Sequence, residues 1–241
     1  MEALQVIEKK PCIFGVALGP GDPDLITVKG LKVLQAVDVI YYPGARFSDG
    51  RMSSYAWSIL EHYQLNSDKC KGFYLDMKLD RTSAEETYSA TFQAILKDYN
   101  AGRSIAIVSE GDISTYSSFS YLLHRIHAEN LETKLIPGIT SYNLAAAEQQ
   151  VPLCLQNEQL LVLPRVKDAA MLTEALERYD GLILMKIKSS IEMIAEVLKT
   201  QKEAKVFYCE RLGTAQQFIS SNWDEILTRN IPYFSLIIVR K

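Results

Sequence analysis

The stretch that decides the fold is "LGPGDPDLITVKG", residues 18–30. It lies between an apolar run, "IFGVA", and a segment whose apolar residues have helical spacing, "LKVLQAV". This order predicts a buried strand, a turn-rich loop and a helix with Thr27 as its N-cap, which is the repeating unit of an α/β protein. Loops that follow the strands of an α/β sheet often shape a ligand site. The residues of this loop therefore restrict which ligand it can bind.

The loop does not fit a dinucleotide site. Counted from Gly19 and Gly21, the Gly-x-Gly-x-x-Gly pattern requires a third glycine where this sequence has Asp24. Pro20 and Pro23 lack the amide N–H donors that a pyrophosphate cradle uses. A Gly-Lys-Ser/Thr phosphate loop is also absent from the sequence. We therefore expect this loop to bind neither NAD nor a nucleoside triphosphate.

Composition excludes several classes of protein. The chain has 241 residues, 48% of them hydrophobic and 23% charged, which is ordinary for one large or two small globular domains. The net charge of −3 provides no general basic field for nucleic acid. No apolar stretch approaches the roughly 18 residues of a membrane span, and "MEALQVIEKKP" lacks the features of a signal peptide. We expect a cytoplasmic protein with no membrane or nucleic-acid partner.

Cysteine and histidine usage does not indicate a metal site. The four cysteines are Cys12, Cys70, Cys154 and Cys209. No two of them form a Cys-x-x-Cys pair, so we expect reduced thiols in place of a disulfide framework or a zinc site. His124 and His127 lie three residues apart on an expected helix, but the sequence indicates no third ligand. A solvated helix face is the favoured interpretation of that pair, and we predict no metal.

Apolar runs and helical segments alternate along the whole chain. Strands are predicted at residues 12–18, 37–44, 103–108, 160–164, 182–187, 205–209 and 233–239. Helices are predicted at residues 27–36, 83–99, 141–149, 169–179 and 190–199. A further helical face is formed by Tyr116, Phe119, Leu122, Leu123 and Ile126. We expect Pro43 and Gly44 to end the second strand. The alternation predicts an α/β fold, and we place the boundary between two domains, 1–114 and 115–241, after "SEGDIS".

A second loop, Glu110-Gly111-Asp112 in "SEGDIS", also follows a predicted strand. Gly111 would let the backbone approach a ligand closely, and the Asp112 carboxylate could hold a hydroxyl or an amine. The alternative is that both glycine loops are tight turns whose aspartates cap helices. The residues alone leave these two interpretations open.

Six motifs together resemble the tetrapyrrole methylase family. In order they are "GPGDPDLITVKG", "VDVIYYPG", "SEGDISTYSSFSYL", "IPGITS", "LILMKI" and "CERLGT". The resemblance covers nearly the whole chain. One departure is Ile113, where the family usually has proline. Because the ligand contacts of that segment are largely made by backbone, we expect the change to matter little.

The resemblance implies two α/β domains of the tetrapyrrole methylase type, with S-adenosylmethionine in the cleft between them and a homodimeric assembly. Transfer of its methyl group would convert the cofactor to S-adenosylhomocysteine. The match of motifs places these residues at the cofactor: Pro20, Glu110, Gly111, Asp112, Thr115, Thr140, Ser141, Met185 and Gly213. By itself Met185 equally fits a core strand, and Thr140 or Ser141 equally fits a helix cap.

The implied reaction moves a methyl group from a sulfonium to an electron-rich carbon of a reduced tetrapyrrole, so the protein mainly orients two ligands and excludes water. Glu110 and Tyr116 are candidates for the base that removes a proton from the methylated carbon, although Tyr116 also fits the apolar helical face. The substrate's carboxylates need basic partners, for which arginine forks are suited. The candidates, in order of preference, are Arg46 and Arg51, then Lys186, Lys188 and Arg211.

The segment "EGD…YSSFSYL" is most similar to the branch of the family that methylates C20 of precorrin-2, with or without cobalt, in cobalamin and porphyrin biosynthesis. Other branches methylate uroporphyrinogen III, different corrin carbons, ribosomal RNA or diphthine intermediates. The RNA branch is disfavoured because the sequence has no basic stripe. A module that binds S-adenosylmethionine or a tetrapyrrole without turnover is the alternative from another functional class.

Overall fold

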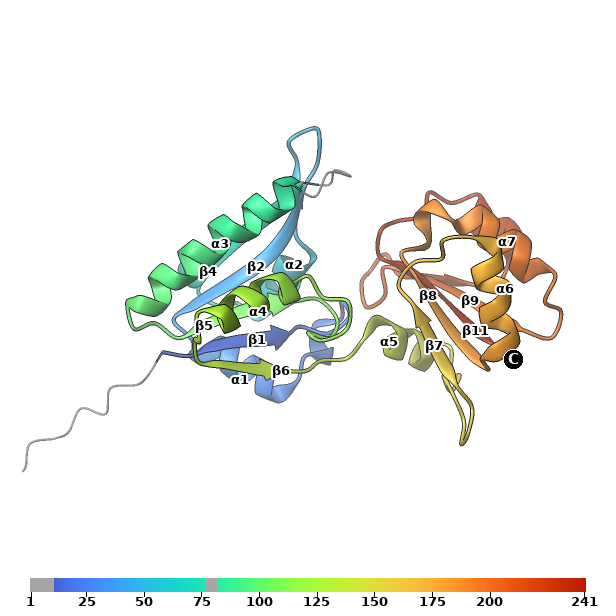
Figure 1. Ribbon diagram of the computed structural model, residues 1–241, viewed down its shortest axis with the longest axis horizontal. Coiled ribbons are helices and arrows are strands. Elements are labelled where there is room, and N and C mark those ends of the chain that lie inside the picture. Colours follow the sequence, from blue (N-terminus) through green and yellow to red (C-terminus); the bar gives the residue numbers. More distant parts are fainter. Residues whose placement is uncertain (1–10, 77–81) are drawn as a thin grey trace, which may run out of the picture. The chain divides into compact units, whose positions relative to one another are not determined.

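The computed structural model describes residues 11–76 and 82–241 (Figure 1). The chain forms two compact units. The first runs to Ile139 and the second from Thr140 to Lys241, except that Pro20–Asp22 of the first loop belongs to the second unit. The predicted boundary after Ser114 lies inside the first unit, because β6 (Thr133–Ile136) still pairs with β1 (Ile13–Ala17) in the first sheet.

The first unit is a mostly parallel sheet with helices on both faces (Figure 1). Its other strands are β2 (Val39–Arg46), β3 (Met52–Ser53), β4 (Cys70–Asp76) and β5 (Ile105–Ser109). Its helices are α1 (Val28–Ala36), α2 (Tyr55–His62), α3 (Thr82–Asn100) and α4 (Phe119–Ala128). The strand order is β3-β2-β5-β1-β6, with β4 pairing the other edge of β2. This is a three-layer α/β unit, as the alternation of segments predicts.

Alternate residues of the first sheet's central strands enter two separate cores. In β5, Ile105 and Ile107 pack with side chains of α3 and α4, whereas Ala106 and Val108 pack with side chains of α1 and α2. Burial on both faces explains why the sequence of this strand is a continuous apolar run. Thr27 caps α1 as predicted, because its hydroxyl accepts a hydrogen bond from the Gly30 N–H at 3.0 Å.

One strand prediction was wrong in its length. β2 continues through Pro43 and Gly44 to Arg46. Its pairing with β5 ends at Tyr41, so the missing N–H of Pro43 breaks no ladder with β5, and the strand continues against β4.

The second unit is a mixed sheet with strand order β10-β9-β11-β8-β7. Its strands are β7 (Leu160–Leu163), β8 (Gly181–Met185), β9 (Lys205–Glu210), β10 (Phe218–Ser220) and β11 (Ser235–Arg240). Its helices are α5 (Ser141–Glu148), α6 (Ala169–Arg178), α7 (Ile191–Lys199) and α8 (Trp223–Leu227). β11 lies between β8 and β9 and runs antiparallel to both. The carboxyl ends of β8 and β9 therefore lie at the same edge of the sheet.

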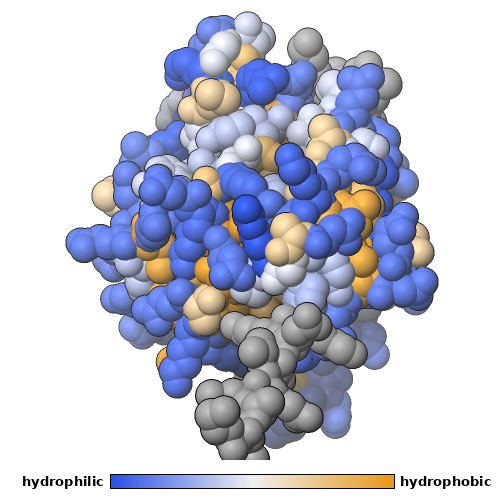
Figure 2. Space-filling view, turned by 90° about the vertical axis from the view of Figure 1, so that its left-hand side faces the viewer, coloured by the Kyte–Doolittle hydropathy of each residue, from blue (hydrophilic) through white to orange (hydrophobic). Residues whose placement is uncertain are grey.

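Hydrophilic side chains cover most of the face drawn in Figure 2, and the apolar groups between them are small and separate. Among the described residues, no helix is long and apolar enough to cross a membrane. His124 and His127 lie on α4. Within the described ranges, no three His, Cys, Asp or Glu side chains come together in a way that could hold a metal ion.

Candidate functional site

The two glycine loops that the sequence singles out are joined in the first unit. The Gly111 N–H donates to the Gly19 carbonyl at 2.7 Å, and the Gly19 N–H donates to the Gly111 carbonyl at 3.2 Å. Both loops follow strands that pair in parallel, β1 and β5, and therefore leave the same edge of the sheet. Ligands of open α/β sheets bind at this edge.

Both glycines are required by the backbone. Gly19 has φ 83° and Gly111 has φ 68°, a region that disfavours any side chain. A Cβ on Gly19 would also lie 2.9 Å from the Leu25 carbonyl oxygen. A Cβ on Gly111 would meet no atom within 4 Å, so the backbone of the second loop borders open space. This geometry fits a ligand that packs directly against main chain.

A third loop, the "IPGITS" segment after β6, joins the other two through Asp112. The Asp112 carboxylate accepts hydrogen bonds from the Gly138 N–H at 2.9 Å, the Ser114 N–H at 2.9 Å and the Thr115 hydroxyl at 3.2 Å. Burial alone would raise the pKa of Asp112, but these hydrogen bonds hold it below its usual value. Asp112 is 8% exposed, so its carboxylate holds the loops in place and presents little surface to a ligand.

Gly138 has no room for a side chain. A Cβ at this position would lie 2.5 Å from the Ala17 Cβ and 2.7 Å from the Gly111 carbonyl oxygen. Gly138 lies within the "IPGITS" motif, but nothing in the sequence itself sets it apart as a packing residue. Its contacts make it the packing point of the three loops.

Glu110 directly follows β5, and its side chain reaches the start of α2. One of its carboxylate oxygens accepts a hydrogen bond from the Ala56 N–H at 3.1 Å. Burial raises the pKa of Glu110, and the backbone N–H groups of Glu110 and Ala56 offset only part of that rise. A partly buried carboxyl group with a raised pKa is suited to hold or accept a proton.

Tyr116 does not belong to the helical face that its spacing predicts. It precedes α4 with a left-handed backbone, φ 52°, and is 49% exposed. Phe119, Leu122 and Ile126 do form the buried face of α4. Ile113, which departs from the family pattern, is buried in the same core.

The second unit contains the remaining predicted cofactor residues. Thr140 caps α5, since its hydroxyl accepts a hydrogen bond from the Asn143 N–H at 3.3 Å, and Ser141 is the first residue of that helix. Met185 ends β8 and is partly exposed. Gly213 has φ 73°, and a Cβ there would lie 2.2 Å from the Asp22 nitrogen. Gly213 is thus in contact with the segment that contains Pro20.

The two arginines preferred for carboxylate binding already have acidic neighbours in the first unit. Arg51 pairs with Asp49 at 2.6 Å in the turn between β2 and β3, and its guanidinium lies 5.5 Å from the Phe47 ring centroid. Arg46 ends β2 and lies 3.9 Å from Asp76. A substrate carboxylate would have to compete with these partners.

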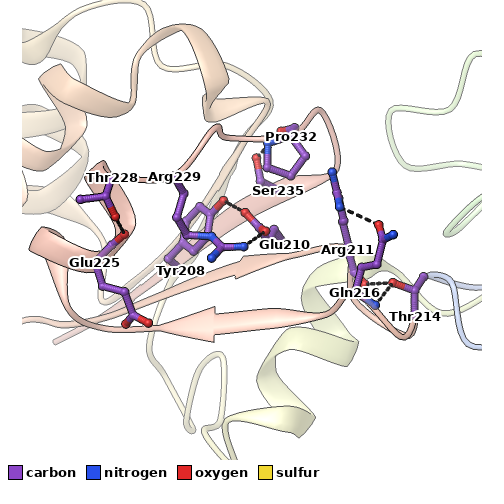
Figure 3. A network of polar contacts seen from close by, with 10 residues as sticks. All are labelled: Tyr208, Glu210, Arg211, Thr214, Gln216, Glu225, Thr228, Arg229, Pro232 and Ser235. Atoms are coloured by element: carbon purple, nitrogen blue, oxygen red, sulfur yellow. Dashed lines mark hydrogen bonds and ion pairs between the residues drawn. The ribbon is translucent and has the colours of Figure 1, made fainter.

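The end of β9 is held by a buried ionic network (Figure 3). Glu210, 3% exposed, accepts hydrogen bonds from Arg229 at 2.6 Å and from the Tyr208 hydroxyl. The Arg229 guanidinium lies 3.7 Å from the Phe218 ring centroid. No pattern in the sequence predicts this network, because Arg229 meets Glu210 and Phe218 only once the segment after α8 folds back on β9 and β10. It fixes the strand end from which the turn of Gly213 starts.

Comparisons with known proteins agree with this geometry. The chain is 28% identical to the cobalt-precorrin-2 C(20)-methyltransferase of Salmonella typhimurium, over 95% of this chain and 96% of that protein. It is 29% identical to the precorrin-2 C(20)-methyltransferase of Sinorhizobium sp, over 94% of each chain. Its fold resembles that of uroporphyrin-III C-methyl transferase from Thermus thermophilus complexed with S-adenyl homocysteine, with a TM-score of 0.63, 16% identity and coverage of 95% and 97%.

The family model for Tetrapyrrole (Corrin/Porphyrin) Methylases matches residues 12–226, which span most of both units and contain all six motifs. The resemblance that those motifs carry is therefore confirmed. This chain belongs to the tetrapyrrole (corrin/porphyrin) methylase family.

Proposed function

We propose that this protein transfers one methyl group from S-adenosylmethionine to C20 of precorrin-2 or cobalt-precorrin-2, a step of corrin-ring synthesis. One observation carries the proposal: similarity to C20-methyltransferases extends over at least 94% of this chain and of both relatives. The motif "SEGDISTYSSFSYL" lies within that similarity and contains the second glycine loop. The family membership supports the reaction class, and the two relatives support the position of the methyl group.

The residues of the loops fit S-adenosylmethionine. The open space beside the left-handed backbone of Gly111 admits a ligand against main chain, and Pro20 and Pro23 make the first loop unsuited to phosphates. A relative of the same fold has been solved with the demethylated cofactor. We assign to cofactor binding Pro20, Glu110, Gly111, Thr115, Thr140, Ser141, Met185 and Gly213, together with Asp112, which acts through the loop that it holds.

When bound, S-adenosylmethionine supplies a methyl group on a positively charged sulfur. The chain's own contribution is to position two ligands and to keep water from them. Asp112 and Gly138 hold the loops in one arrangement, so little reorganisation is needed when the ligands bind. Asp112 thus acts on the cofactor through the loop that it fixes.

Glu110 is our first candidate for the group that takes the proton from C20 after methylation. Its raised pKa favours holding that proton. Tyr116 is the second candidate, because its exposure leaves the phenol accessible. Arg46, Arg51 and Lys186 are the candidates for the substrate's carboxylates. A homodimeric assembly, which the family resemblance implies, and a cytoplasmic location complete the proposal.

The function is tested by incubating the protein anaerobically with S-adenosylmethionine and precorrin-2, with and without cobalt. We expect release of S-adenosylhomocysteine and a product heavier by one methyl group. Turnover of uroporphyrinogen III in place of precorrin-2 would assign the chain to another branch. Binding without S-adenosylhomocysteine release would make it a non-catalytic module.

A further inference from the structure

The edge of the second sheet where β8 and β9 end carries two cations in an unusual backbone conformation. Lys186 follows the last residue of β8, and Arg211 follows the last residue of β9. Their φ angles are 52° and 49°. Left-handed backbone is uncommon for residues other than glycine, asparagine and aspartate, and it carries an energetic cost.

Strain of this kind clusters at functional sites. The turn after β9 does contain a glycine with left-handed backbone, Gly213, only two positions beyond Arg211. Arg211 and Lys186 nevertheless carry long charged side chains at the strained positions. Glycine would be unstrained at both positions. The presence of long charged side chains there, despite the strain, is what needs a functional explanation.

Among the residues that the structure describes, no acid neutralises either cation. Within residues 11–76 and 82–241, Lys186 and Arg211 make no ion pair. The Arg211 guanidinium donates to the neutral side-chain oxygen of Gln216 at 2.6 Å (Figure 3). The acid next to Arg211 in the chain, Glu210, is already paired with Arg229 at 2.6 Å. The charges of Lys186 and Arg211 are therefore available to a ligand.

Two exposed aromatic residues lie at the same edge. Tyr233 and Phe234 come directly before β11, the strand between β8 and β9, and are 53% and 43% exposed. Their rings meet edge to face with centroids 5.2 Å apart. The Arg211 N–H donates to the Phe234 carbonyl at 2.9 Å, which places Arg211 beside Phe234. The edge thus combines two cations with two aromatic rings.

We propose that Lys186, Arg211, Tyr233 and Phe234 form the subsite that recognises the carboxylated rim of the tetrapyrrole, a role that rests on the proposed function. Lys186 and Arg211 bind peripheral carboxylates, and Tyr233 and Phe234 contact the flat macrocycle. The strands that carry the two cations are two strand spacings apart, about 10 Å, so each cation serves a separate carboxylate. Among this chain's basic candidates, Arg211 becomes the first choice, ahead of Arg46 and Arg51, whose charges are already paired.

The subsite is tested first by binding. Uroporphyrin, a stable ring rich in carboxylates, is titrated against wild type and the Arg211→Gln and Lys186→Gln variants, with tryptophan fluorescence as readout. Loss of one charge-assisted contact should weaken binding roughly tenfold or more, while affinity for S-adenosylmethionine stays unchanged. The affinity for coproporphyrin, which has fewer carboxylates, should fall less in the same variants. Arg178→Gln removes a charge from the exposed face of α6 and should change neither affinity.

The stability of glycine variants gives a second, independent test. Arg211→Gly and Lys186→Gly should raise the urea midpoint of unfolding, because glycine accepts the left-handed backbone, and should still weaken uroporphyrin binding. Gln156→Gly is the matched control, since Gln156 has φ 43° on an exposed loop. It should raise the midpoint and leave binding unchanged.

The role of the two aromatic rings is tested by the Tyr233→Leu and Phe234→Leu variants. Both should raise the KM for the tetrapyrrole and leave the sedimentation coefficient of the protein unchanged. Dissociation of an oligomer in these variants would overturn the proposal, because the rings would then belong to an interface between copies of the chain. Unchanged uroporphyrin binding in both cation variants would also overturn it, even if C20 methylation proceeds. Binding that depends on Arg211 without any C20 methylation would uphold the subsite and reject the proposed function.

Discussion

Gly19 and Gly111 exchange two backbone hydrogen bonds, of 2.7 Å and 3.2 Å, at the carboxyl ends of β1 and β5. The sequence presents their loops as two separate motifs, whereas the structure makes them one unit. Asp112 and Gly138 add the loop after β6 to that unit. The candidate cofactor residues of the first unit are therefore positioned by contacts distant in sequence.

Gly111→Val should abolish measurable binding of S-adenosylmethionine while the fold is retained. Valine is strained at φ 68°, at a cost of about 1–3 kcal/mol, and its side chain would occupy the open space beside the loop. Gly102→Val is the matched control, because Gly102 has φ 77° and similarly open surroundings on a different turn. Calorimetry should show normal cofactor affinity for the control alone. Normal affinity in both variants would reduce Gly111 to a turn residue.

Gly138→Ala should lower the free energy of unfolding by about 1–3 kcal/mol, because the new methyl group overlaps the Ala17 Cβ and the Gly111 carbonyl. Urea denaturation followed by circular dichroism measures the change. Relaxation of the loops should also weaken S-adenosylmethionine binding. An unchanged midpoint of unfolding would mean that the three loops are not packed as tightly as these contacts indicate.

Glu110→Gln should stabilise the fold at neutral pH and lower kcat. A folded-state pKa above the ordinary 4.5 means that the native protein binds this proton more tightly than the unfolded chain. Stability contributed by Glu110 is thus present below pH 4.5 and is lost as pH rises through the raised pKa. Glutamine can still accept the Ala56 N–H bond without that loss. Urea denaturation midpoints of wild type and Glu110→Gln, measured across this pH range, test the prediction. An equal dependence of the midpoint on pH in the two proteins would contradict it.

Arg51→Ala should raise the KM for the tetrapyrrole if Arg51 binds a carboxylate, with S-adenosylmethionine affinity unchanged. Asp49→Asn provides a variant with the opposite expected effect, because Asp49 now occupies the Arg51 guanidinium at 2.6 Å. An aspartate is ionised at neutral pH, and the hydrogen bond from Arg51 lowers the pKa of Asp49 further, so this carboxylate competes with the substrate for Arg51. Steady-state kinetics should show a higher KM for the first variant and a lower KM for the second. An unchanged KM in both variants would mean that residues of the second unit bind the substrate's carboxylates.

Much of the fold follows from the sequence because buried parallel strands are continuous apolar runs, as in β1, β5 and β8. The edge strand β4 was missed, since only Phe73 of its residues is fully buried. Helix α2 was also missed, although Ala56, Ile59 and Leu60 have the spacing of a buried helix face. Its eight residues are too few for that spacing to stand out.

The candidate site could be predicted only in part. Left-handed backbone at Gly19 and Gly111 follows from residue type, and the six motifs identify the family. The same conformation at Tyr116 and Arg211 does not follow from residue type, because tyrosine and arginine rarely adopt it. The ion pairs that occupy Arg46 and Arg51 also depend on the folded arrangement of β2, β3 and β4.

The position of the transferred methyl group tests the central claim most directly. Precorrin-2, with and without cobalt, is incubated with S-adenosylmethionine labelled with carbon-13 at the donor methyl, and the product is examined by NMR. The proposed function predicts a single labelled methyl group on C20, the bridge carbon between two rings. A label on a pyrrole carbon, or on no carbon of this substrate, would contradict the assignment, while the family and the fold would stand.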